Sequence, residues 1–389
     1  MELPAELPEP SADEREASER MRDCVRRALR AAGGFLPFEQ YMELVLFAPG
    51  LGYYVGGTRK FGPDGDFTTA PERSPLFGRA LANFWHAQRQ PGDTVLEFGG
   101  GSGRLALAML DELAQRDALP ARYAIVELSP ALRECQQALL LAQPWAGRVS
   151  LEWLTGPPPV PFTGLALANE VLDSLPVVAF EVGADGFRER GVVEEGTGFG
   201  WSARPASAAL ARRIQATLGT SGHPEGYRGE INLRLPAWLA DLPNFVRGGL
   251  ALLFDYGEPR RMLLHPSQAD GTLRSFYRHR LLDDLFWLPG LQDITASVDF
   301  TAVAEAATAA GLEVLGYTTQ ASFLLANGIE RMLAEAMARD MAEASKLALQ
   351  ARALLLPGEM GVRFKVMALG LAHADGLTGF CERDERHRL

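Results

Sequence analysis

Cysteine is scarce in this sequence of 389 residues, and its three copies, Cys24, Cys135 and Cys381, lie far apart. They form neither a C-x-x-C pair nor an even set, which argues against a disulfide framework and against a zinc site. The sequence also lacks any apolar run near the roughly 18 to 20 residues that a membrane-spanning helix needs. We therefore expect a protein of the reducing cytoplasm, with no bound metal and no membrane partner.

Positive charge is in short supply as well. The chain has 38 Lys and Arg against 49 Asp and Glu, which gives a formal net charge of −11. Such a balance argues against a general affinity for nucleic acid. The first 20 residues are rich in Pro, Glu and Asp, so we expect neither a secretory signal, which needs an apolar core, nor a transit peptide, which is poor in acids.

What the sequence does contain is a regular alternation of short apolar segments with helical ones. Apolar residues make up 47% of the chain, enough for a sizeable core. Strands are expected at residues 94–98, 122–127, 149–153, 164–168, 249–255, 312–318 and 362–370, and helices at 105–113, 130–141 and 329–354. Strands that alternate with helices predict βαβ units, and hence an α/β fold with a largely parallel sheet.

Other segments extend or interrupt this pattern. We expect a helix at residues 13–32, a mainly structured loop at 41–77 and a helix at about 74–88. This divides the chain into an N-terminal extension, residues 1–90, and a domain, residues 91–389, with insertions at about 175–247 and 257–298. The first insertion contains strand-like pieces at 177–182 and 187–193 and a helical stretch near 235–246, whereas the second is expected to be loop.

The most informative motif follows the first of these strands. Residues 97–103 have the pattern E-x-G-x-G-x-G, with Glu97, Gly99, Gly101 and Gly103 at its fixed positions. A dinucleotide site would need G-x-G-x-x-G, but the third glycine of that pattern falls on Arg104. Glu97 would also repel a pyrophosphate, whereas it suits a nucleoside that carries positive charge and no phosphate, such as S-adenosylmethionine.

A second acid lies at the end of the next strand. Glu127 follows Gly103 by 24 residues, in the position from which a carboxylate accepts hydrogen bonds from ribose hydroxyls. This holds for NAD and for S-adenosylmethionine alike, so Glu127 places the nucleoside without identifying it. The simpler interpretation is a tight turn followed by a solvated strand end.

Polar residues at the end of the fourth strand are candidates for the acceptor side. If the chain turns helical after Asn169, then Glu170 and Asp173 share one face and could grip a guanidinium or orient an amine. The alternative is an ordinary Asn cap before a solvated helix. Asp66, Thr69 and Glu72 belong to a Gly-Pro loop that could fold over the site or be only structural.

With these motifs in hand, the chain resembles the MidA-like family of class I methyltransferases, which includes a mitochondrial complex I assembly factor that methylates a protein arginine. The matching segments appear in the family's order and are residues 60–72, 74–78, 97–103, 126–130, 168–176, 228–231, 255–257, 271–274, 293–295, 298–300 and 360–370.

The resemblance implies a Rossmann-like, mostly parallel sheet of seven strands with helices on both faces, and insertions that form a substrate cap. It also implies that S-adenosylmethionine is the cofactor, held by Glu97, the glycine loop and Glu127. Residues expected around the donor are Leu128, Asn169, Thr69 and Glu72, and those expected to be catalytic are Glu170, Asp173 and Asp66.

The predicted reaction is methyl transfer to a protein side chain, with arginine as the acceptor. Transfer from a sulfonium needs an in-line nucleophile and exclusion of water more than covalent help. Two other functions fit the same residues: a small-molecule N- or O-methyltransferase, and a non-catalytic S-adenosylmethionine-binding assembly factor. A nicotinamide or flavin oxidoreductase is disfavoured by the glycine spacing and by Glu97.

Overall fold

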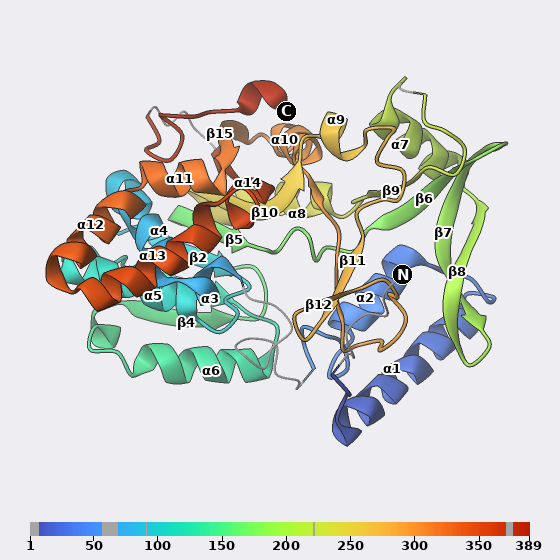
Figure 1. The fold of residues 1–389 in the computed structure, drawn as a ribbon, viewed down its shortest axis with the longest axis horizontal. Helices are drawn as coiled ribbons and strands as arrows, with labels where there is room; N and C mark the ends of the chain where they lie inside the picture. Colours follow the sequence, from blue (N-terminus) through green and yellow to red (C-terminus); the bar gives the residue numbers. More distant parts are fainter. Residues whose placement is uncertain (1–7, 57–68, 91, 221, 371–375) are drawn as a thin grey trace. The chain divides into compact units, whose positions relative to one another are not determined.

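The computed structural model describes residues 8–56, 69–90, 92–220, 222–370 and 376–389 (Figure 1). The chain forms two compact units, each made of three segments. Unit 1 comprises Met1–Phe67, Asp173–Arg234 and Arg260–Ser297, and unit 2 comprises Thr68–Leu172, Leu235–Pro259 and Val298–Leu389. Each unit therefore has its own core.

Unit 2 is an α/β unit built on a mixed sheet. Its strands follow the order β15-β16-β10-β5-β2-β3-β4, and β14 pairs with β10 beside this path. The strands are β2 (Thr94–Phe98), β3 (Arg122–Val126), β4 (Ser150–Leu154), β5 (Phe162–Asn169), β10 (Val246–Glu258), β14 (Val298–Asp299), β15 (Glu313–Thr319) and β16 (Phe364–Gly370). Strands β10, β5, β2, β3 and β4 are parallel, whereas β16 and β15 run antiparallel to their neighbours. The predicted α/β class is thus confirmed.

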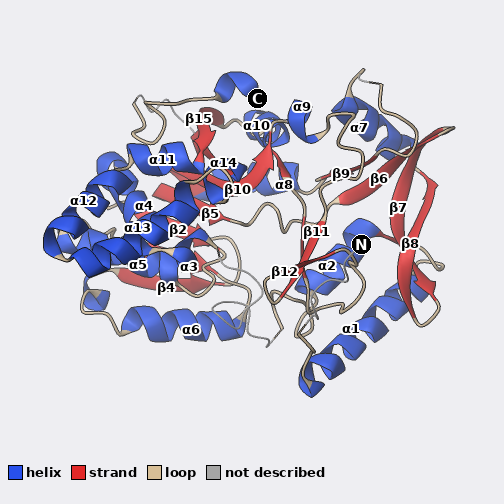
Figure 2. Ribbon diagram, viewed as in Figure 1, coloured by secondary structure: helices blue, strands red, loops and turns tan. Residues whose placement is uncertain are grey.

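Helices accompany this sheet, as Figure 2 shows in blue. They are α3 (Ala70–Arg73), α4 (Pro75–Gln88), α5 (Arg104–Gln115), α6 (Pro130–Leu141), α8 (Leu235–Phe245), α10 (Phe300–Ala309), α11 (Gln320–Ala326), α12 (Ile329–Arg339), α13 (Met341–Leu355) and α14 (Met360–Arg363). Helix α4 buries Leu76, Phe77, Ala80, Leu81 and Phe84, the residues whose helical spacing predicts this face. Their burial beside the apolar strands forms the main core.

The prediction of one long helix at residues 329–354 is wrong, because the structure has two helices there. The chain breaks at Asp340, whose backbone is extended and whose side chain accepts hydrogen bonds from the amides of Ala342 and Glu343 at the start of α13. A carboxylate in this position satisfies amides that have no partner within the helix. Apolar periodicity continues through the break, which is why the pattern alone predicts one helix.

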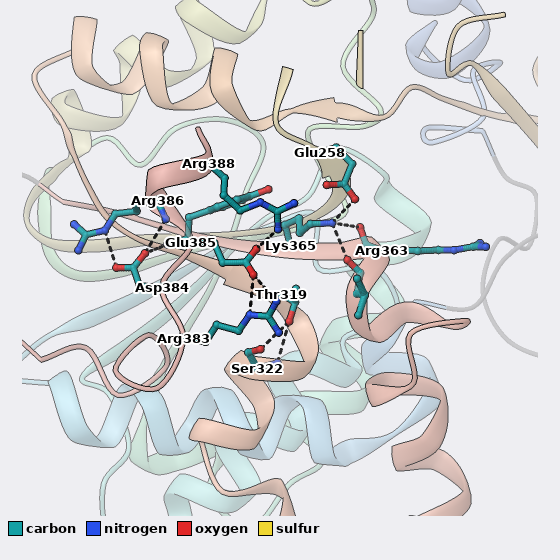
Figure 3. Close-up of polar contacts among 12 residues, drawn as sticks. Glu258, Thr319, Ser322, Arg363, Lys365, Arg383, Asp384, Glu385, Arg386 and Arg388 are labelled. Atoms are coloured by element: carbon teal, nitrogen blue, oxygen red, sulfur yellow. Dashed lines mark hydrogen bonds and ion pairs between the residues drawn. The ribbon is translucent and has the colours of Figure 1, made fainter. Parts of the chain in front are cut away.

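The C-terminal residues lie along β15, the strand at one end of this sheet. The amide of Glu385 donates to the carbonyl of Tyr317, and the amide of Tyr317 donates to Asp384 Oδ1. Figure 3 shows ion pairs within this tail: Glu385 contacts Arg383 and Arg388, and Asp384 contacts Arg386.

A buried lysine lies in the same region. The Nζ atom of Lys365 on β16 donates to Glu258 Oε1 at 2.8 Å and to the carbonyl of Val362 at 2.7 Å. Burial lowers the pKa of Lys365, while its hydrogen bond to Glu258 raises it. Its donors are used within the fold, which indicates a structural role.

The part of unit 1 that the structure describes contains two antiparallel sheets and four helices. The larger sheet has the order β1-β7-β6-β9, with β8 paired to β7, and the smaller has the order β12-β11-β13. The strands are β1 (Leu36–Pro37), β6 (Val178–Gly183), β7 (Gly186–Glu195), β8 (Gly198–Pro205), β9 (Arg228–Ile231), β11 (Arg274–Tyr277), β12 (Arg280–Leu282) and β13 (Asp293–Thr295). The helices are α1 (Ala12–Ala31), α2 (Phe38–Phe47), α7 (Ala208–Leu218) and α9 (Arg260–Leu263).

Several expectations for these segments can be compared with the structure. The predicted N-terminal helix is confirmed as α1, which Ser11 and Glu14 begin with a reciprocal capping box. Two others are wrong: part of the segment expected to be loop from residue 41 is helix α2, and the second insertion contains strands β11 to β13. Among the described residues, no helix is long and apolar enough to cross a membrane.

Candidate functional site

The glycine loop lies between β2 and α5 in unit 2. Gly99, Gly101 and Gly103 have φ values of 66°, 53° and 85°, which L-residues with a side chain rarely adopt. A Cβ atom on Gly100 would come within 2.7 Å of Ile125 Cγ2. The backbone path of this loop therefore requires the glycines of the sequence pattern.

Glu97 is buried at the end of β2. Its Oε2 atom accepts a hydrogen bond of 2.6 Å from the hydroxyl of Tyr123 on β3. Burial raises the pKa of Glu97 to about 7, the Tyr123 hydrogen bond opposes this rise, and the charge of Glu127 adds to it. A nearby cation would oppose this rise, because it favours the ionised carboxylate.

Glu127 lies just after β3 and is held by donors from two sides. Its Oε1 atom accepts from the amide of Ser129 at 2.9 Å, and its Oε2 atom accepts from Gln136 Nε2 at 3.1 Å. Each carboxylate oxygen has two lone pairs, so these contacts fix the orientation of Glu127 and leave it able to accept further hydrogen bonds.

Gln136 on α6 is a residue that the sequence analysis missed. It is fully buried, and its Nε2 atom also donates to the carbonyl of Gly101 at 2.8 Å. Its Oε1 atom accepts from Trp153 Nε1 on β4 at 3.0 Å. One amide thus joins the glycine loop, the acid after β3 and the neighbouring strand. No local motif marks it, since a glutamine on a helix face is ordinary in sequence.

Glu72 contacts the glycine loop from helix α3. It accepts a hydrogen bond from the hydroxyl of Ser102, and its Oε2 atom lies 2.9 Å from Arg104 Nε. Thr69 is buried and precedes α3, and its carbonyl accepts from the amides of Glu72 and Arg73. This arrangement brings Thr69 and Glu72 into the part of unit 2 that contains the glycine loop.

The end of β5 has an unusual backbone. Glu170 has a φ of 55°, and its amide donates to the carbonyl of Phe254 on β10 at 2.8 Å. Asn169 Nδ2 donates to Glu170 Oε1 at 3.2 Å, while the enclosed Asn169 Oδ1 atom has no donor among the described residues. Asp255 holds the following turn, since its Oδ2 atom accepts from the amide of Leu172 at 2.9 Å. Positive φ is uncommon for a residue other than glycine, and the strained residues that do occur cluster at functional sites.

The conditional prediction of a helix after Asn169 is wrong. The chain continues as bends and a turn, so Glu170 and Asp173 do not share a helix face. Asp173 is buried and belongs to unit 1, where its carbonyl accepts from the amide of Ala296. Leu128 is half exposed beside Glu127, and Asp66 lies outside the described residues.

A family model described as "Putative S-adenosyl-L-methionine-dependent methyltransferase" matches residues 76–318, more than half of the chain. The chain belongs to this family. It is an S-adenosylmethionine-dependent methyltransferase, and S-adenosylmethionine is its cofactor. The sequence-based predictions of family, reaction class and donor are confirmed.

A crystal structure of a Burkholderia thailandensis protein bound to S-adenosyl-homocysteine has 39% sequence identity to this chain and a TM-score of 0.92. The match covers 99% of this chain and 100% of that one. A native structure from the same organism, with the same identity and coverage, has a TM-score of 0.89. These similarities confirm the α/β methyltransferase fold.

Curated relatives carry more specific names. The Danio rerio "Protein arginine methyltransferase NDUFAF7, mitochondrial" is 30% identical, with 87% of this chain and 84% of that protein covered. The Homo sapiens protein of the same name is also 30% identical, with 91% and 84% covered. The expectation of a cytoplasmic protein is wrong on this comparison, since these relatives are named as mitochondrial proteins.

The residues of unit 2 fit this cofactor. The glycine loop has no side chains at Gly99, Gly101 and Gly103, Glu127 is an oriented carboxylate, and Asn169 Oδ1 is an enclosed acceptor with no donor among the described residues. The methyl donor has ribose hydroxyls and an ammonium group, which are hydrogen-bond donors for such acceptors. Among the described residues, no group of three or more His, Cys, Asp or Glu side chains could hold a metal ion.

Proposed function

We propose that this chain methylates an arginine side chain of a protein. The observation that carries the proposal is the name shared by relatives about 30% identical, which are called protein arginine methyltransferases and are matched over more than four fifths of their length. The acidic net charge of −11 suits a cationic acceptor.

In this proposal, the residues that surround the donor are Glu97, Gly99, Gly101, Gly103, Glu127, Leu128, Asn169, Thr69 and Glu72. The hydrogen bonds of Glu127 and Glu72 support these roles, because they fix both side chains against or near the glycine loop. Glu72 then acts mainly through Ser102 and Arg104, and Glu127 acts on the ribose.

Glu170 is proposed as the acceptor anchor. A guanidinium group has a pKa above about 12 and is therefore protonated and a poor nucleophile. A carboxylate that hydrogen-bonds one nitrogen concentrates positive charge there and leaves another nitrogen better able to attack. Bound S-adenosylmethionine supplies an electrophilic methyl group on sulfur. Asp173 and Asp66 remain predicted partners in orienting the acceptor.

We further propose that unit 1 is the substrate-recognition part of the chain, the role predicted for a cap built from the insertions. It contains the segments 173–234 and 260–297, which interrupt the α/β pattern of unit 2. The predicted seven-stranded core with helices on both faces, and the absence of nucleic-acid and membrane partners, belong to the same proposal.

The variant Glu170→Gln tests the anchor. It keeps the size of the side chain and one acceptor oxygen, replaces the other oxygen by an NH₂ donor, and removes the charge. We expect S-adenosyl-homocysteine binding by calorimetry to stay within about twofold, while labelled methyl transfer to arginine falls by at least about a hundredfold, a size typical of lost transition-state contacts.

Glu152→Gln is the matched control, since Glu152 lies on β4 and pairs with Arg122. It should change neither measurement. Turnover retained by Glu170→Gln would reject Glu170 as the anchor. Label found only in small metabolites, or donor binding without any methyl transfer, would reject the protein acceptor itself.

A further inference from the structure

Two segments of unit 1 converge on one carboxylate. Glu230 lies on β9, and Thr272 lies just before β11. The Oε2 atom of Glu230 accepts from the amide of Thr272 at 2.8 Å and from its hydroxyl at 3.0 Å. Both segments, 228–231 and 271–274, are among those that carry the family resemblance, and the donor site of unit 2 uses neither of them.

The other oxygen of Glu230 has a different environment. Its Oε1 atom is enclosed and has no hydrogen-bond donor among the described residues. Gly271 lies against it with a φ of 72°, and a Cβ atom on Gly271 would come within 2.3 Å of Glu230 Oε1. Glycine at this position therefore leaves room for the oxygen. An enclosed carboxylate oxygen without a donor is costly, and burial accordingly raises the pKa of Glu230.

A buried cation lies on the same face of the larger sheet. Arg188, Glu181 and Arg228 are paired across β7, β6 and β9. Two positions further along β7 and β9 are Arg190 and Glu230, and because side chains alternate along a strand, both point to this face.

The side chain of Arg190 packs against an aromatic ring. It is 8% exposed, and its guanidinium carbon lies 3.9 Å from the ring centroid of Trp201. No hydrogen-bond acceptor contacts its guanidinium among the described residues. Burial lowers the pKa of Arg190 and the charge of Arg228 lowers it further, while the charges of Glu230 and Glu181 oppose this. The face thus carries one enclosed acceptor atom without a donor, Glu230 Oε1, and one guanidinium that stacks on Trp201.

We propose that Glu230 and Arg190 form a recognition site for an arginine residue of the protein substrate. Glu230 Oε1 accepts a hydrogen bond from the substrate guanidinium, and Arg190 donates to a carbonyl or carboxylate oxygen of the same substrate segment. This inference rests on the proposed function, which it deepens by assigning substrate recognition to named residues of unit 1.

The chemistry favours a guanidinium over other ligands. A carboxylate with one oxygen already saturated by Thr272 offers its second oxygen to a donor, and charge-assisted hydrogen bonds are the stronger kind. A purely anionic ligand would satisfy Arg190 but would be repelled by Glu230. A ligand that has a cationic donor and an oxygen acceptor satisfies both side chains.

The test uses the full chain saturated with S-adenosyl-homocysteine and two probes, ethylguanidinium and its neutral analogue 1-ethylurea. Ligand-observed NMR should detect binding of ethylguanidinium and at least tenfold weaker binding of 1-ethylurea. Glu230→Gln should weaken ethylguanidinium at least tenfold and leave S-adenosyl-homocysteine affinity within twofold.

Glu230→Gln is chosen because its carbonyl oxygen can still accept from Thr272 while its NH₂ group replaces the oxygen without a donor. Because glutamine has no charge to bury, its melting temperature should be unchanged or higher. A fall in melting temperature with unchanged ethylguanidinium affinity would show a structural role and overturn the proposal. Glu189→Gln, which removes an ion pair with Arg204 on the same sheet, is the matched control.

A second variant tests the role of Arg190. Arg190→Met should weaken N-acetylarginine, which carries a carboxylate, at least fivefold, while ethylguanidinium stays within twofold. If Arg190→Met leaves the affinity for N-acetylarginine and the affinity for ethylguanidinium both unchanged, Arg190 is not part of the site.

The outcomes separate this inference from the function on which it rests. If the wild-type chain methylates protein arginine and Glu230→Gln binds ethylguanidinium as the wild type does, the recognition site is wrong and the function stands. If the wild type neither labels arginine nor binds ethylguanidinium, the acceptor assignment fails as well.

Discussion

At the scale of single residues, Glu97 shows how a binding residue affects stability. Its pKa is raised from 4.5 to about 7. The folded chain therefore holds a proton between about pH 4.5 and 7 that the unfolded chain releases, and stability falls as pH rises through this window. Above about pH 7 the ionised, buried carboxylate imposes its full cost.

Glu97→Gln should remove this dependence. Relative to the variant, the wild type should lose on the order of 3 kcal/mol of unfolding free energy between about pH 4.5 and 7, from the size of the pKa shift. Urea unfolding at a series of pH values measures the difference, and comparison with the variant removes the contribution of other groups such as Glu230. A constant difference across the series would contradict the assignment.

Gln136 is the residue whose loss should lower both stability and donor affinity. Gln136→Leu keeps the side chain's bulk but removes bonds to Gly101, Glu127 and Trp153. We expect a stability loss of about 1–3 kcal/mol from unsatisfied buried groups. We also expect at least tenfold weaker S-adenosyl-homocysteine binding by calorimetry.

The control for this substitution is Gln143→Leu, because the side-chain amide of Gln143 donates to the carbonyl of Leu139 near the end of α6, away from the glycine loop. It should leave donor affinity unchanged. An unaltered affinity in Gln136→Leu would mean that Glu127 and the glycine loop hold their geometry without the amide.

At the scale of elements, helix boundaries are set by caps that apolar spacing does not show. Asp340 separates α12 from α13 by accepting two amide hydrogen bonds. Asp340→Ala should cost about 1 kcal/mol of unfolding free energy, the typical value for a lost N-cap. Urea denaturation measures this, with the exposed Asp241→Ala on α8 as a control that should differ by no more than about 0.5 kcal/mol.

Particular elements also show how much the sequence predicts. The strands around Glu97 and Glu127 were predictable because apolar runs, glycines and terminal acids coincide there. Helix α2 was not, because aromatic residues and nearby glycines suggest loop as readily as helix. The roles of Gln136 and Glu230 could not be predicted, since each depends on contacts with strands or loops distant in sequence, to Trp153 and Thr272.

At the scale of the whole molecule, the chain passes repeatedly between its two units. Each unit needs three separated segments, so neither corresponds to one continuous stretch. Folding must therefore close long loops before either core is complete, and long-range closure slows folding more than it changes stability. Isolated expression of a single segment would leave most of the relevant core absent.

The C-terminal tail that lies along β15 has a practical consequence for handling the protein. Asp384, Glu385 and Arg386 make hydrogen bonds to backbone groups of β15, the strand at one end of the sheet order. Removing residues 383–389 would uncover those groups, and uncovered edges invite pairing with another copy. The shortened protein should form concentration-dependent oligomers in light scattering, and a strictly unchanged mass would contradict this. Purification tags therefore belong at the other terminus.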